Sequence, residues 1–141
     1  MASIHKQIDI DADPDVVWDA VRDFGALHKR LVRGFVIDAQ LDGDARIVTF
    51  ASGTVQREPL IDCDDVARRL VYGAVDSPIG ITHYNAAVEV SPGPESGTRI
   101  DWIVDVLPHE LRDFLEQAMD LGAAAMKRTL EREEAGDGPV G

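Results

Sequence analysis

The sequence predicts an α+β fold in which a curved antiparallel sheet wraps around one long C-terminal helix. Two observations carry this prediction. A first strand and two short helices precede a run of six strand-like segments, and a helical apolar periodicity then covers Pro108 to about Glu134. A helix of about 27 residues is roughly 40 Å long. A single sheet that covers such a helix has to curve around it.

The first segments of the chain have clear local signals. Apolar and polar residues alternate from Ile4 to Ile10, which predicts a half-buried strand. Asp13 can cap the helix that follows, and Pro14 suits its first turn. A second short helix is expected over about residues 26–31.

The middle of the chain predicts strands joined by short turns. Asp42-Gly43 is a strong hairpin signal, and Ser52-Gly53 marks the next turn. Pro59 has no N–H to donate, so an irregularity is expected in its strand. The six predicted strands are Gly34 to Gln40, Ala45 to Ala51, Thr54 to Asp62, Arg68 to Val75, His83 to Ser91 and Arg99 to Val106.

Small residues occupy the centre of the apolar stripe on the final helix. At 100° per residue, one line along the helix holds Leu111, Leu115, Ala118, Gly122, Ala125 and Thr129. Either a neighbouring element approaches the helix closely at these positions, or the helix covers an open space. We favour an open space, because the elements before the helix predict a curved sheet.

Composition excludes several classes of function. The chain has 141 residues, a net charge of −12 and one cysteine, Cys63. An acidic surface repels nucleic acid and anionic lipid, and a single cysteine allows no internal disulfide. We find no signal peptide, transmembrane segment, phosphate-binding loop or metal-ligand spacing, so we expect a cytoplasmic protein without cofactor or metal.

The element order and several short segments resemble the polyketide cyclase/dehydrase group of the START-like superfamily, whose fold is the helix-grip fold of the birch-pollen allergen. The resemblance covers residues 3 to 133. The segments that carry it are Asp13-Pro14-Asp15-Val16-Val17-Trp18, Asp23-Phe24-Gly25-Ala26-Leu27-His28, Glu58-Pro59-Leu60, Asp64-Asp65, Arg69-Leu70-Val71-Tyr72 and Thr98-Arg99-Ile100-Asp101-Trp102. It implies a bacterial protein with a seven-stranded sheet, an internal apolar cavity and a single ligand-binding domain over residues 1–135. Residues 136–141 are then expected to form a disordered tail.

Strand alternation then predicts which side chains line the cavity. Inward positions fall at Tyr72, Tyr84, Ala86 and Trp102. In the strand before Pro59, either Val55 and Arg57 or Gln56 and Glu58 face inward. Related hormone receptors carry an inward glutamate in a similar segment, which favours Glu58 and Leu60. The same comparison places Lys29 near a ligand-anchoring lysine, and the helix would contribute Leu115, Ala118, Met119 and Gly122.

Two functions remain open. The first is binding of a hydrophobic small molecule (a lipid, a polyketide or an aromatic metabolite) in the cavity. The alternative is a polyketide cyclase or dehydratase in which Glu58 acts as acid or base and Tyr84 polarises a carbonyl. We prefer binding, because the inward positions are mostly apolar. The loop 76–82 and the turn 51–54 are expected at the cavity mouth, and exposed Ile79 and Ile81 could support a homodimer.

Overall fold

A computed structural model describes residues 1–134 as a seven-stranded sheet, three α-helices and short 3-10 turns. The strands are β1 (Ala2–Ile10), β2 (Val36–Asp42), β3 (Ala45–Phe50), β4 (Val55–Asp64), β5 (Arg69–Gly73), β6 (His83–Pro92) and β7 (Thr98–Leu107). The helices are α1 (Pro14–Arg22), α2 (Leu27–Arg30) and α3 (Arg112–Glu134).

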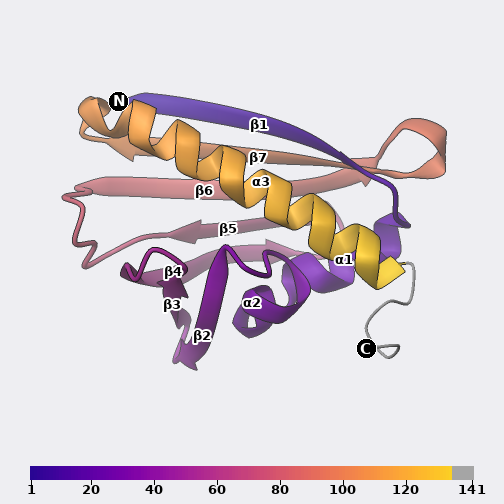
Figure 1. The fold of residues 1–141 in the computed structure, drawn as a ribbon, viewed down its shortest axis with the longest axis horizontal. Coiled ribbons are helices and arrows are strands. Elements are labelled where there is room, and N and C mark those ends of the chain that lie inside the picture. Colours follow the sequence, from indigo (N-terminus) through magenta and orange to yellow (C-terminus); the bar gives the residue numbers. More distant parts are fainter. Residues whose placement is uncertain (135–141) are drawn as a thin grey trace.

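The sheet has the order β1-β7-β6-β5-β4-β3-β2, and neighbouring strands are antiparallel throughout. The long strands β1, β7 and β6 form one half of the sheet, and β2 and β3 curl away from them (Figure 1). The chain therefore begins in one edge strand, β1, and places the other edge at β2.

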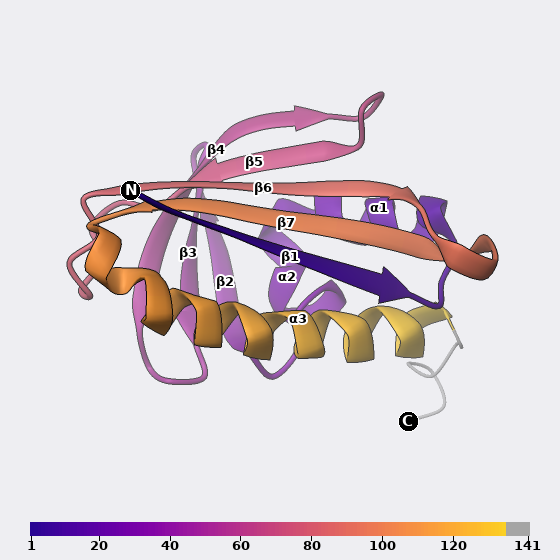
Figure 2. The same ribbon diagram turned by 90° about the horizontal axis from the view of Figure 1, so that it is seen from above.

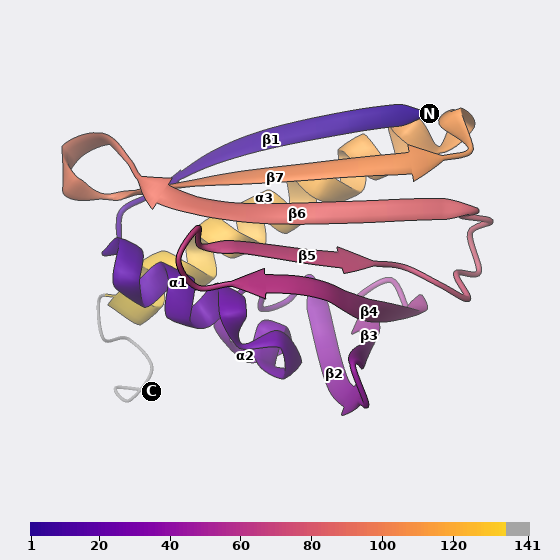
Figure 3. The same cartoon turned by 180° about the vertical axis from the view of Figure 1, so that it is seen from behind.

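Helix α3 crosses one face of this sheet. Seen from above, it runs along β1 and β7 while β2 and β3 bend toward the same side (Figure 2). The opposite view shows the sheet in front of the helix, with α1 and α2 beside its lower strands (Figure 3). This is the predicted helix-grip arrangement, in which the curved sheet holds a long helix.

Local sequence signals explain the start of α1. The Asp13 side chain accepts a hydrogen bond from the Asp15 backbone N–H at 2.8 Å, and Pro14 occupies the first helical turn. The helix buries Val17 and Val21 against the sheet. Trp18 donates its indole N–H to Asp65 Oδ1 at 3.0 Å, which ties α1 to the β4–β5 turn.

Several predicted boundaries shift by a few residues. The first hairpin turn occupies Gly43 and Asp44, one residue later than predicted. The α-helical part of the last helix begins at Arg112, after a 3-10 turn over His109–Leu111. The expected irregularity in β4 is confirmed, since its register with β5 shifts between Leu60 and Asp62. Residue 135 and the predicted tail, residues 136–141, lie outside the described residues.

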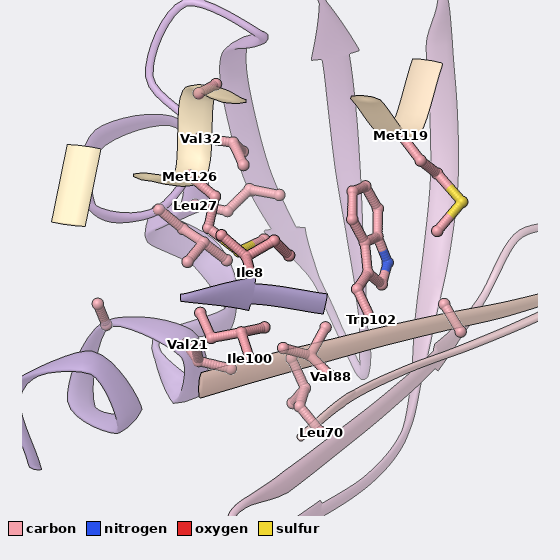
Figure 4. Close-up of a cluster of buried hydrophobic side chains, with 14 of the residues drawn as sticks. Ile8, Val21, Leu27, Val32, Leu70, Val88, Ile100, Trp102, Met119 and Met126 are labelled. Atoms are coloured by element: carbon pink, nitrogen blue, oxygen red, sulfur yellow. The ribbon is translucent and has the colours of Figure 1, made fainter. Parts of the chain in front are cut away.

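The packed core fills the end of the molecule where α1, α2 and the last turns of α3 meet the sheet. Figure 4 shows Ile8, Val21, Leu27 and Met126 gathered there, and Trp102 standing beside them. The other end of the space between α3 and the sheet is less completely filled, and it holds the candidate site.

Candidate functional site

A cavity of about 510 Å³ lies between the sheet and α3. Its walls come from α2, the start of β2 and the segment between them, from strands β3 to β7, and from α3. Most of the lining side chains are apolar, and the charged residues among them are Arg46, Glu58 and Arg128. A largely apolar pocket with few polar groups is the usual form of a small-molecule site.

A buried ion pair forms the polar part of the wall. Arg46 on β3 and Glu58 on β4 are direct cross-strand partners, and their residues are only 3% and 4% exposed. Arg46 Nε donates to Glu58 Oε1 at 2.8 Å, and Gln56 Nε2 donates to Glu58 Oε2 at 2.8 Å. Both carboxylate oxygens therefore have donors, as a buried charge requires.

Aromatic rings hold the arginine in place. The Arg46 guanidinium lies over the Phe24 ring at 4.1 Å from its centroid and over the Tyr72 ring at 4.8 Å. Arg46 Nη1 also donates to the Phe24 carbonyl oxygen at 3.1 Å. Cation–π contacts and hydrogen bonds together fix the planar side chain against the wall.

Two tyrosines face the cavity beside this pair. The rings of Tyr72 and Tyr84 have centroids 6.2 Å apart and are tilted by 40°. Burial, followed by the charge of Glu58, raises the pKa of Tyr72 to about 12. Burial, followed by the neighbouring Tyr72, raises the pKa of Tyr84 well above 10. Both phenols are therefore protonated at neutral pH, and both can donate a hydrogen bond.

The predicted small-residue stripe of α3 serves two purposes. Ala118 and Ala125 line the cavity, as expected for a helix that covers a space. Gly122 instead receives two rings: a Cβ built there would lie 3.0 Å from Trp102 Cη2 and 3.2 Å from Phe35 Cε2. A close approach by neighbouring elements, the explanation that we did not favour, is thus correct at Gly122.

Most of the predicted site residues do line the cavity. They are Glu58, Tyr72, Tyr84, Trp102, Leu115, Ala118 and Met119. For β4, the inward pair is Gln56 and Glu58, while Val55 is exposed and lies on the other face. The predicted mouth segments also contribute, through Ala51, Ser52, Thr54 and Ile79.

Four of the residues predicted to contact a ligand do not line the cavity. Lys29 is exposed on α2 and lies outside the lining, because the short helix turns its side chain to solvent. Leu60 stands at the β4 irregularity and packs against the core instead. Ala86 is fully buried beneath its neighbours, and Gly122 is covered by Trp102.

The expected exposure of two isoleucines is also wrong. Ile79 is half-buried and lines the cavity, while Ile81 is half-buried and packs against the core. These residues therefore provide no exposed apolar pair, and a homodimer stays a prediction without support from them.

Sequence reasoning missed Arg46, the partner of Glu58. A usable signal was present, because Arg46 and Glu58 are equally distant in sequence from Ser52 in the predicted turn. In an antiparallel hairpin such residues lie opposite each other. A two-residue turn at Ser52-Gly53 would instead place Arg46 opposite Pro59, so the ion pair follows only when the turn is centred on Ser52, as it is in the structure.

Among residues 1–134, no group of three or more histidine, cysteine, aspartate or glutamate side chains is placed to hold a metal ion. Over the same residues, no helix is long and apolar enough to cross a membrane.

Comparison with known families decides the classification of this fold and cavity. Residues 1–133 match the family described as polyketide cyclase / dehydrase and lipid transport. The chain belongs to this family. The match spans the whole sheet and all of α3 except its last residue, so the cavity and its walls lie entirely within the polyketide cyclase / dehydrase and lipid transport domain. No curated protein matches the chain.

Solved structures share the fold at low sequence identity. The protein XoxI from Bacillus cereus is 22% identical with a TM-score of 0.82, and the match covers 92% of this chain and 96% of that one. A protein from Thermobifida fusca is 26% identical with a TM-score of 0.76, covering 95% and 93%. A START superfamily protein from Mycobacterium smegmatis is 12% identical with a TM-score of 0.77, covering 92% and 97%.

Proposed function

We propose that this member of the polyketide cyclase / dehydrase and lipid transport family binds a hydrophobic small molecule in the cavity between the sheet and α3. The observation that carries the proposal is the cavity itself, about 510 Å³ in volume and largely apolar in its lining. Lipids, polyketides and aromatic metabolites are the ligand classes that such a lining suits. Removing their apolar surface from water supplies most of the binding free energy.

The mouth of the cavity supports this proposal. Phe114 and Leu121 on α3 line the opening and are 55% and 66% exposed, which leaves apolar surface where a ligand enters. Exposed apolar side chains around an opening are typical of ligand-binding grooves. Ile79 and Ser52 approach the same opening from the loops of the sheet.

A cyclase or dehydratase reaction is the second candidate, and the ion pair weighs against its simplest form. Both oxygens of Glu58 already accept hydrogen bonds, from Arg46 and Gln56, so a proton transfer by Glu58 would have to break a buried contact. The protonated phenol of Tyr84 could still polarise a carbonyl. Template folding of a flexible chain, with Tyr84 as hydrogen-bond donor, is the version that the geometry favours.

A cavity-filling variant tests the binding proposal. Ala118→Leu extends a half-buried lining side chain into the cavity, while Ala67→Leu makes the same chemical change at an exposed position in the β4–β5 turn. Nile red, a neutral apolar dye, serves as the probe. We expect Ala118→Leu to weaken dye binding by roughly ten- to a hundredfold, which corresponds to the free-energy cost of inserting extra methyl groups into a packed site.

Ala67→Leu should leave dye binding unchanged. Circular dichroism melts of both variants check that the fold is retained. Equal dye affinity in the two variants would contradict ligand binding in this cavity. Native mass spectrometry of the purified wild-type protein adds an independent test, since the mass of a co-purified small molecule would identify the ligand class directly.

A further inference from the structure

An unpartnered hydrogen-bond donor stands in the wall of the cavity. Trp102 is 7% exposed and lines the cavity, and its buried indole nitrogen Nε1 has no hydrogen-bond partner. The other tryptophan, Trp18, donates its indole N–H to Asp65. Leaving a buried N–H without an acceptor is costly, so native structures rarely do so without a reason.

No neighbouring group among the described residues accepts a hydrogen bond from the indole N–H of Trp102. In Figure 4 the nitrogen-bearing edge of Trp102 is turned to the side of Met119, away from Ile8 and Leu27. Its N–H lies near enough to the Tyr72 hydroxyl to influence that group, although the pair does not reach hydrogen-bond geometry. An indole N–H can only donate. The group that completes this site must therefore supply an acceptor atom.

The charges around the cavity indicate that this acceptor is neutral. The positive charge of Arg46 is matched by Glu58 at 2.8 Å, so the buried lining residues within the described part of the chain offer no uncompensated cation to an anion. Arg128, the remaining charged lining residue, is exposed at the rim. A carboxylate placed beside Trp102 would lose its hydration without gaining a counter-ion, whereas a carbonyl oxygen would lose far less.

We propose that the ligand of this cavity carries an uncharged acceptor oxygen, such as a ketone or ester carbonyl, which accepts hydrogen bonds from Trp102 Nε1 and from the phenol of Tyr72 or Tyr84. The proposal rests on the proposed function and narrows it to one ligand class. Free fatty acids and other carboxylates would be poorer ligands than neutral carbonyl compounds with the same apolar skeleton.

Three naphthalene derivatives of nearly equal size separate the possibilities. They are 2-acetylnaphthalene, which has a ketone, 2-isopropylnaphthalene, which has no polar atom, and 2-naphthoate, which has a carboxylate. Each is titrated into the 15N-labelled wild-type chain while the indole N–H signals are followed by NMR. The chain has two tryptophans, so two indole signals are present and the Trp18 signal is an internal control.

We expect 2-acetylnaphthalene to bind about five- to tenfold tighter than 2-isopropylnaphthalene, the gain from one net hydrogen bond. It should also shift the Trp102 indole proton downfield relative to the hydrocarbon, which carries the same ring and the same ring-current effect. The Trp18 signal should not move with either compound. The variant Trp102→Phe also assigns the two indole signals. In this variant the affinity ratio of the ketone to the hydrocarbon should fall to the value that a hydrogen bond from the tyrosine phenol alone provides.

The wild-type titration decides the question even if Trp102→Phe fails to fold. Equal affinity and equal indole shifts for the ketone and the hydrocarbon would overturn the inference while leaving hydrophobic ligand binding intact. Tightest binding by 2-naphthoate with a shifted Trp102 signal would overturn the requirement for a neutral acceptor. Failure of all three compounds to bind would count against the proposed function itself.

Discussion

The buried pair of Arg46 and Glu58 should be far more sensitive to substitution than an exposed pair of the same type. At an effective dielectric constant of about 20, unit charges 2.8 Å apart attract each other by about 6 kcal/mol. Glu58→Gln removes the negative charge and leaves the Arg46 guanidinium buried without a counter-ion. We expect the free energy of unfolding to fall by about 3–5 kcal/mol.

The sheet contains a matched control. Arg69 and Glu89 are also direct cross-strand partners, with Arg69 Nε 3.0 Å from Glu89 Oε1, but their side chains are 43% and 42% exposed. Glu89→Gln is the same chemical change at a solvated pair and should cost less than about 1 kcal/mol. The two variants differ mainly in burial, so the comparison isolates that factor.

Urea unfolding followed by circular dichroism measures both effects. With a slope near 1.5 kcal/mol per molar urea, a loss of 3 kcal/mol lowers the midpoint by about 2 M. The double variant Arg46→Met with Glu58→Gln should cost less than the sum of the single changes, because each single change leaves one buried charge without its partner and the double change leaves none. Equal costs for Glu58→Gln and Glu89→Gln would refute the reasoning and show that water in the cavity solvates the pair.

This prediction also changes how Glu58 can be tested as a catalytic group. Since Arg46 depends on Glu58, lost activity in this variant would not by itself indicate acid or base chemistry. A variant must first be shown to be folded at the temperature of the assay.

The remaining predictions concern packing and pH. Gly122→Ala should destabilise the fold by about 1–3 kcal/mol in a thermal melt. The steric cost of the new Cβ against the Trp102 ring should exceed the stability that alanine adds through its higher helix propensity. A raised melting temperature would show that the ring can move away. Tyr72 and Tyr84 have raised pKa values, so unfolded tyrosines ionise near pH 10 while the folded ones stay protonated. Stability should therefore fall as pH rises from 10 toward 12, and absorbance at 295 nm should rise only together with unfolding. Hydrogen bonds and ion pairs lower the pKa values of several surface carboxyl groups in the folded state. These groups therefore stabilise the fold above about pH 4, and this contribution to the free energy of unfolding should be lost as the pH falls through their lowered pKa values. An acid titration followed by circular dichroism would detect the loss. These carboxyl groups are Asp9, Asp65, Asp101 and Glu131.

The fold could be predicted because its signals are local. Alternation along β6 and β7, the capped start of α1 and the periodicity of α3 each depend on residues close in sequence. The inward positions of Tyr84 and Trp102 follow from the same alternation. These residues line the cavity as expected.

Errors arose where the position depends on a distant neighbour. Lys29 lies on a four-residue helix whose orientation is set by packing on β2 and α3, which no local pattern records. Leu60 follows Pro59, and the register shift there breaks the period of two that alternation arguments require. Ala86 faces the correct side, but a methyl group is too short to reach past its neighbours into the cavity.

Gly122 shows why the small residues of α3 cannot be given a single role. Helical periodicity identifies the positions where α3 leaves room, but the opposite strand decides whether that room is filled. Trp102 fills it at Gly122, and no comparable side chain fills it at Ala118. The ring that Gly122 accommodates also carries the unpartnered N–H of the cavity wall. A bulkier residue at Gly122 would therefore change both the volume of the cavity and the direction of its donor, so packing on α3 and ligand recognition are coupled through one side chain.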